Sequence, residues 1–222
     1  MADIDNYNTP TPINRTSIPG NYITLSLLYW VPATGNRNFI VDANGYLRDV
    51  NTWVEGSNAT GVALIMDEHK IVIAPNNVGE YSWCPYNKLL DCVTHTELSD
   101  ALTDYDGVSN TYTIANNGGN GAIACRTYES GIMTKLYWWM PSAGELNTIF
   151  QNVESINIAL EAISGTPLTS DEITDYWSST QYDKGVAWAY FDKSYEWTIV
   201  GKTTQCNVRP VGNYDQVTPR PL

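Results

Sequence analysis

Apolar residues gather along much of the chain in short β-branched and aromatic stretches, which are typical of strands. Asn44-Gly45 separates two of these stretches, and the pair favours a hairpin turn because both residues tolerate positive φ. A polar interruption at residues 67–70 predicts a tight turn between two buried strands. The stretches expected to contain strands are residues 22–31, 38–41, 46–54, 61–74, 135–140 and 176–211.

A different spacing follows Pro141, where the pattern changes to that of a helix. Ser142, with Glu145 three residues later, has the form of a capping box. Apolar residues then recur every three or four positions, at Leu146, Ile149, Phe150, Val153, Ile156, Leu160 and Ile163. The pattern predicts one continuous helix from Ser142 to Ser164, ended by Gly165 as a C′ glycine. Shorter helical pieces are expected within residues 106–130.

The first part of the chain differs from the rest. Residues 1–20 contain three prolines among polar residues, which predicts an extended arm. The polar stretch 55–58 is interpreted as a boundary. We therefore expect residues 1–57 to form an arm and a small β module for attachment or oligomerisation, followed by a main domain over residues 58–222.

Charge excludes two classes of partner. The 222 residues include 12 Lys and Arg against 24 Asp and Glu, a formal net charge of −12, without a basic cluster. Nucleic acids and anionic membrane surfaces both require such clusters, so neither is expected as a partner. No apolar run approaches the ~20 residues of a membrane span. Residues 1–8 show neither the basic nor the apolar region of a signal peptide, so synthesis and retention in the cytoplasm, or exit inside a particle, is expected.

The cysteines do not follow the spacing of a metal or redox site. Cys84, Cys92, Cys125 and Cys206 form no CxxC pair. Without a signal peptide, free and mostly buried thiols are favoured over disulfides.

Three motifs then occur in a fixed order: WMPSAGEL at Trp139–Leu146, YWSST at Tyr176–Thr180 and VRPV at Val208–Val211. Together they resemble the C-type-lectin-fold domains of gut-bacterial surface proteins and their phages, with Met140 where leucine is usual. The resemblance extends over residues 58–212. It implies an α+β, C-type-lectin-like fold with twisted antiparallel sheets, preceded by the small β-rich module. The motif residues themselves are expected to build the fold, with Arg209 pairing with a carboxylate or backbone carbonyls.

The stretch between the second and third motifs forms the exposed ligand face in such domains. Carried over by position, the resemblance implies ligand-binding roles for Tyr182, Asp183, Lys184, Trp188, Tyr190, Asp192, Lys193, Tyr195, Glu196 and Trp197. Tyr182, Tyr195 and Trp197 stand beside charged residues and are expected to be exposed anchors, because aromatic side chains give rigid contact area. The alternative is that Trp188 and Tyr190 point into the core of a two-faced strand.

The function implied by the resemblance is recognition without catalysis. The expected protein is a virion component, such as a head or tail fibre, that binds other virion proteins or further copies through residues 1–57. Its lectin-fold domain would bind a host-surface glycan or protein. One alternative is a purely structural virion protein without a host ligand.

A more distant alternative is a formylglycine-type oxidase. Such an enzyme needs paired cysteines near the C-terminus, where Cys206 stands alone. No cofactor or metal is expected, because the calcium-binding triplets of sugar-binding lectins do not occur. His69 is expected to be a solvated turn residue.

Overall fold

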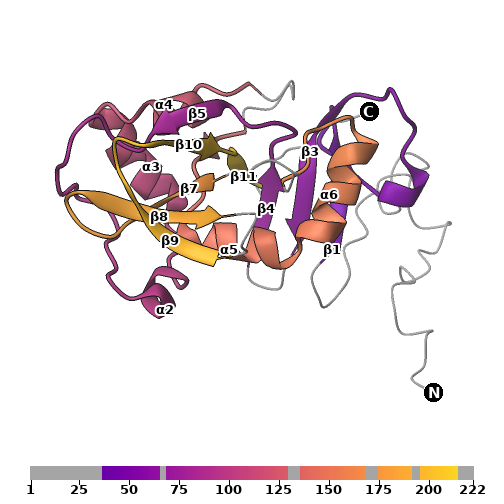
Figure 1. The fold of residues 1–222 in the computed structure, drawn as a ribbon. Helices are drawn as coiled ribbons and strands as arrows, with labels where there is room; N and C mark the ends of the chain where they lie inside the picture. The colour runs from indigo at the N-terminus through magenta and orange to yellow at the C-terminus, as the bar shows by residue number, and fades with distance from the viewer. Residues whose placement is uncertain (1–36, 66–68, 130–135, 169–174, 192–195, 215–222) are drawn as a thin grey trace, which may run out of the picture.

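The computed structural model describes residues 37–65, 69–129, 136–168, 175–191 and 196–214 (Figure 1). The predicted arm and the predicted strand at 22–31 lie outside these residues. The described part of the chain combines two sheets with several helices, which confirms the α+β class. None of the helices in the described ranges has the length and apolar character needed to cross a membrane.

The first sheet has six strands in the order β2-β1-β3-β4-β11-β6, and every neighbouring pair is antiparallel. Its strands are β1 (Arg37–Asp42), β2 (Leu47–Arg48), β3 (Ala59–Ile65), β4 (Lys70–Ile73), β6 (Trp138–Trp139) and β11 (Val211–Asn213). The predicted strand at 46–54 shrinks to the short β2, followed by the 3₁₀ turn η2 (Val50–Thr52). The Asn44-Gly45 turn is confirmed, with Gly45 at a φ of 84°.

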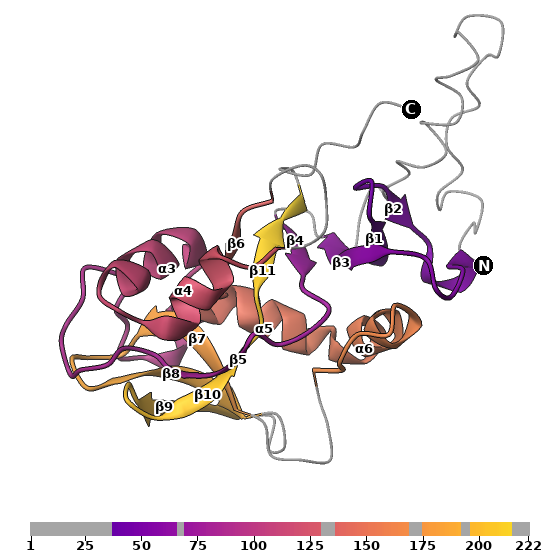
Figure 2. The same cartoon turned by 90° about the horizontal axis from the view of Figure 1, so that it is seen from above.

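The second sheet has five strands in the order β5-β10-β7-β8-β9, with β7 and β10 parallel. Its strands are β5 (Gly79–Ser82), β7 (Asp175–Gln181), β8 (Val186–Phe191), β9 (Glu196–Gly201) and β10 (Gln205–Val208). The helices are α2 (Leu98–Ala101), α3 (Gly107–Asn116), α4 (Asn120–Arg126), α5 (Ala143–Gln151) and α6 (Val153–Ala162). Figures 1 and 2 show α3 and α4 beside the second sheet and α6 beside the first, with α5 between the two sheets.

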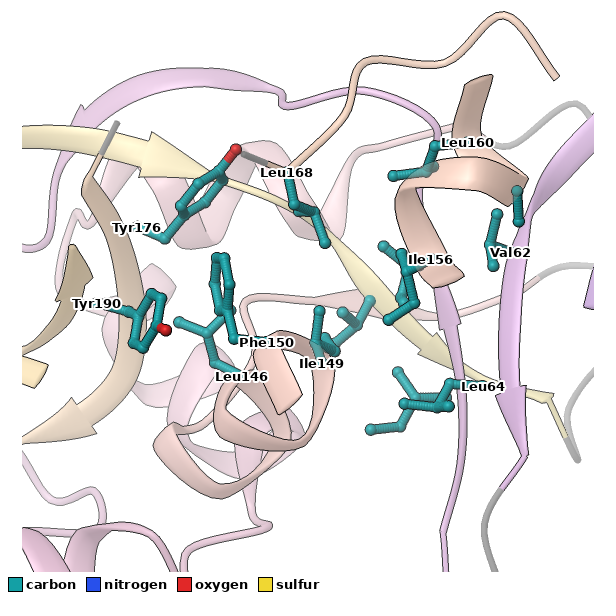
Figure 3. Close-up of a cluster of buried hydrophobic side chains, with 14 of the residues drawn as sticks. Val62, Leu64, Leu146, Ile149, Phe150, Ile156, Leu160, Leu168, Tyr176 and Tyr190 are labelled. Atoms are coloured by element: carbon teal, nitrogen blue, oxygen red, sulfur yellow. The ribbon is translucent and has the colours of Figure 1, made fainter. Parts of the chain in front are cut away.

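The largest buried cluster joins both sheets through α5 and α6 (Figure 3). Phe150 of α5 stacks on Tyr190 of the second sheet, with ring centroids 4.0 Å apart. Ile156 and Leu160 of α6 lie in the same cluster as Val62 of β3. The apolar stripe of the sequence is therefore core, and it holds the second sheet at a fixed position against the first.

The predicted boundary at 57/58 falls within a continuous sheet. Strand β1 pairs with β3 along its whole length, from Arg37 opposite Ile65 to Asp42 opposite Ala59. Residues 37–57 are thus joined by backbone hydrogen bonds to the main domain.

The prediction of one continuous helix from Ser142 to Ser164 is wrong. The capping box forms, but α5 ends at Gln151 and α6 begins at Val153. Asn152 between them has a φ of −117° and a ψ of 16°, and its side-chain amide donates to the carbonyl of Thr148 at 2.8 Å. An asparagine amide that binds a nearby carbonyl competes with the helical ladder, so the helix changes direction here.

The end of α6 also differs from the expectation. The residue in the left-handed region is Ser164, at a φ of 58°. Gly165 serves another purpose, because a Cβ there would lie 2.8 Å from the carbonyl oxygen of Pro75. Gly165 is thus required by close backbone packing.

This geometry predicts opposite effects for two neighbouring substitutions. Ser164→Gly should raise the free energy of unfolding by ~0.5–1 kcal/mol, since glycine adopts positive φ without steric cost. Gly165→Ala should lower it, because the new methyl group meets the Pro75 carbonyl. Urea unfolding of both variants tests this, and a destabilised Ser164→Gly protein would contradict the assignment.

Candidate functional site

Strands β8 and β9 carry the predicted ligand face at the outer edge of the second sheet. Cross-strand pairing sets Trp188 opposite Ile199 and Tyr190 opposite Trp197, so these four side chains share one face. Trp188 and Tyr190 are buried, and Trp197 is half-buried. Ile199, in contrast, is 43% exposed. An apolar side chain thus remains in solvent on a face whose other members are covered.

Contacts between aromatic rings hold the side chains of this face in place. Tyr182 meets Trp188 edge to face at 5.5 Å, and Tyr190 meets Trp197 in the same way at 5.4 Å. Both indoles are also held by hydrogen bonds. Trp188 Nε1 donates to the carbonyl of His95 at 2.8 Å, and Trp197 Nε1 donates to Asn147 Oδ1 at 3.3 Å. The face is consequently rigid, as recognition surfaces built on aromatic residues often are.

Trp197 is not the exposed anchor that its charged neighbours suggested. It packs against the large core cluster of Figure 3 and also against a small cluster of Ala101, Ala143 and Trp188. Trp197→Ala is therefore expected to lower stability. Trp188 and Tyr190 likewise point into the protein, which was the alternative for these two residues.

The polar candidates divide between the turn and the surface. Asp183 accepts from the backbone N–H groups of Gly185 at 2.6 Å and Val186 at 2.9 Å. These bonds hold the pKa of Asp183 below its usual value and shape the β7–β8 turn. Lys184 and Glu196 are exposed. Asp192, Lys193 and Tyr195 lie outside the described residues.

Sequence reasoning missed a buried cation beneath this region. Lys202 Nζ donates to Gln181 Oε1 at 2.5 Å and to the carbonyl of Lys88 at 2.9 Å, and it lies 4.5 Å from the ring centre of Trp83. Burial lowers the pKa of Lys202. Gln181 also binds both backbone groups of Leu90. Together these contacts fasten the loop before α2 to β7. No sequence signal marked Lys202, because lysine is almost always exposed.

The motif residues meet in a second buried polar network. Thr180 Oγ1 donates to Asp104 Oδ2 at 2.6 Å and accepts from the N–H of Ala143 at 2.8 Å. Glu145 accepts from Trp139 Nε1 at 3.1 Å and from the N–H of Ser142 at 2.7 Å. Desolvation raises the pKa of Glu145 to about 7. The WMPSAGEL and YWSST motifs are thus joined by side-chain contacts.

The Arg209 expectation is confirmed for backbone carbonyls. Its Nη1 donates to the carbonyls of Ala74 at 3.0 Å and Pro75 at 2.9 Å, and its Nη2 donates to that of Thr166 at 2.9 Å.

Histidine and cysteine side chains often act in catalysis, and here they are packed against other parts of the protein. His69 is half-buried and its ring stacks on Tyr105 at 4.0 Å, so it is not the solvated residue that was expected. The four cysteines are free, and burial raises the pKa of Cys92 and of Cys206 to about 12. These two thiols are therefore protonated at neutral pH. The described ranges contain no group of three or more acidic, histidine or cysteine side chains able to hold a metal ion.

Comparison with solved structures gives a likeness of fold. No family model matches the chain, and neither does any curated protein. A fimbrial protein from Bacteroides ovatus ATCC 8483 has a similar solved structure, with 16% sequence identity and a TM-score of 0.50 over 64% of this chain. The match covers 35% of that protein, so the chain spans about a third of its length. This likeness concerns the fold.

Proposed function

We propose that the protein is a non-enzymatic recognition component of a virion, with a C-type-lectin-like body that presents the β8–β9 face to a host-surface glycan or protein. The three motifs support the lectin-like assignment, because they are far apart in sequence yet meet in the structure. WMPSAGEL contacts YWSST through Ala143 and Thr180, and it pairs with VRPV through Trp139 opposite Val211. The return of β11 to the sheet begun by β1 and β3 is consistent with it, since the second sheet is then formed from the intervening chain.

The observation that carries the binding role is Ile199. It is 43% exposed on the edge strand β9, directly opposite the buried Trp188. Half-buried Tyr182 contacts the same indole, so Ile199 and Tyr182 both lie beside Trp188. Rigid aromatic residues with an accessible apolar neighbour are typical of interaction hot spots. Exposed Lys184 and Glu196 are polar groups available at its margin.

A second candidate function is a purely structural subunit that binds no host ligand. The fimbrial protein from Bacteroides ovatus favours it, because that protein's name denotes a surface filament. In this case β9 would pair with another copy along its free edge, and residues 1–57 would provide attachment to other virion proteins or to a homo-oligomer.

Substituting Ile199 tests whether the β8–β9 face binds a ligand or serves only the fold. Ile199→Glu should weaken adhesion of the labelled protein to gut-bacterial cells or to an arrayed glycan by about 10-fold or more, since it puts a charge into an apolar contact. The matched control is Ile158→Glu, because Ile158 is 61% exposed but lies on α6. Both variants should melt like the parent, whereas Trp197→Ala should melt earlier.

Two outcomes decide between the candidates. Equal loss of adhesion in Ile199→Glu and Ile158→Glu would contradict the β8–β9 face. If the parent binds no cell or glycan but forms oligomers in light scattering that Ile199→Glu disperses, the structural subunit is the correct function.

A further inference from the structure

A pocket of about 430 Å³ lies at the opposite end of the molecule from β9, where the β1–β2 turn, η2 and the start of β3 come together. This is the indigo and violet part of the chain in Figure 2. Its volume is within the range of about 300–1,000 Å³ that small-molecule sites occupy. The pocket is lined by Asp42, Ala43, Asn44, Arg48, Thr52, Trp53, Val54, Ser57 and Asn58.

One side of the pocket is fixed by an ion pair whose charges cancel. Asp42 Oδ2 accepts from Arg48 Nε at 2.8 Å and from Nη2 at 2.6 Å. Asp42 Oδ1 is occupied as well, because it accepts from the backbone N–H groups of Asn44 and Tyr46, each at 2.9 Å. The carboxylate therefore has no capacity left for a cation, and the guanidinium is held in one orientation with its third nitrogen, Nη1, directed to no acceptor within the described ranges.

Other polar groups around the pocket make no hydrogen bond within the part of the chain that the structure describes. They are the carboxamides of Asn44 and Asn58 and the hydroxyl of Ser57, which are exposed and available to a ligand that displaces water. The indole Nε1 of Trp53 is buried and also lacks a partner among the described residues. Because this nitrogen is buried, it is the ring of Trp53 and not its N–H that lines the pocket.

These groups match one class of ligand. Amides and a guanidinium offer paired donors and acceptors for adjacent hydroxyl groups, and a half-buried indole offers an apolar surface for the C–H side of a ring. We propose that this pocket binds a neutral sugar, one or two pyranose units in size, at a site separate from the β8–β9 face.

Charge argues against an anionic sugar. Arg48 is already neutralised by Asp42, and the whole chain carries a formal charge of −12. A uronate or sialate would therefore meet an unfavourable field. A neutral sugar replaces the hydrogen bonds between its hydroxyl groups and water with bonds to the amides of the pocket. It has no charge, so it does not pay the cost of removing an ion from water.

The test uses the full chain, ¹⁵N-labelled, with methyl pyranosides of mannose, galactose, glucose and N-acetylglucosamine as probes. Titration should shift the Trp53 indole resonance, which Trp53→Phe identifies by its disappearance, with saturation in the millimolar range by at least one neutral probe. Asn58→Trp, which fills the pocket from an exposed position, should weaken that binding at least 10-fold. Asn51→Ala is the matched control, because Asn51 lies in η2 and does not line the pocket.

Methyl glucuronide and N-acetylneuraminate complete the panel. Binding of these acids without binding of any neutral sugar would overturn the charge argument, and no shift of the Trp53 indole by any probe up to 100 mM would overturn the site. Ile199→Glu should leave the titration unchanged, so the result is independent of the β8–β9 face.

Discussion

Replacing Arg209 with methionine is expected to lower the free energy of unfolding by about 3–5 kcal/mol, because several buried hydrogen bonds from one charged donor are lost together. Arg209 is 1% exposed, and it donates to the carbonyl of Ala74, which follows β4, and to the carbonyl of Thr166, which follows α6. Its Nε also donates to Asn77 Oδ1 at 2.6 Å. Methionine fills similar volume but donates to none of these acceptors. The Pro75 carbonyl keeps its bond from the Thr166 N–H, whereas the carbonyls of Ala74 and Thr166 lose the guanidinium.

Urea unfolding at neutral pH measures the effect. The matched control is Arg126→Met, because Arg126 is exposed on α4 and contacts only the ring of Tyr112 among the described interactions. It should change stability by less than about 1 kcal/mol. Arg209→Lys should behave like Arg209→Met, since a single ammonium cannot reach three separate carbonyls. Parent-like stability of either Arg209 variant would show that the network is dispensable.

Stability should also fall as pH rises from about 4.5 to about 7, by an amount of up to about 3 kcal/mol. Glu145 is buried, and desolvation raises its native pKa to about 7 from an ordinary value of 4.5. The native state therefore holds a proton that the unfolded chain releases over this interval. The stabilisation that comes from this proton is fully present below the pKa of Glu145 in the unfolded chain, 4.5. It is lost as the pH rises past the pKa of Glu145 in the native state, about 7.

The charged group facing Glu145 is Asp104, whose carboxylate raises the pKa further. Bonds from Ser142 and Trp139 act in the opposite direction but do not offset burial. Glu145→Gln removes the titrating group, so the difference in unfolding free energy between parent and variant should change across this pH range. Glu161→Gln, at an exposed position on α6, should leave the parent's profile intact. A pH-independent difference between parent and Glu145→Gln would show that Glu145 ionises normally.

Local sequence patterns correctly predicted the elements whose structure depends on neighbouring residues. The capping box at Ser142 and the hairpin at Asn44-Gly45 depend on residues within four positions of each other. Short aromatic stretches likewise predicted the strands β7 to β10. Long-range pairing was not visible in this way. The ladder between β1 and β3 joins residues that the polar stretch 55–58 separates, and nothing local records which strand lies beside which.

The candidate face shows the same limit at the level of single residues. Charged neighbours predicted exposure for Trp197, but its burial is decided by Tyr190 on the adjacent strand and by Asn147 on α5. Lys202 is buried for an equally non-local reason, since its partners Gln181 and Lys88 come from other parts of the chain. Alternation along a strand tells which residues share a face, but not which face is covered.

The register of the first sheet has a mechanical consequence. Arg37 of β1 stands opposite Ile65, Ile65 opposite Lys70, and β11 runs toward that same end as it approaches Asn213. The described chain thus enters and leaves at one end of the sheet, with β3 and β4 between the two exit points. Tension between these points acts across the strands, along their hydrogen bonds, and opens the ladder one bond at a time. A tether on only one side would leave this ladder unloaded, whereas a load passed from one exit point to the other would act directly on its hydrogen bonds.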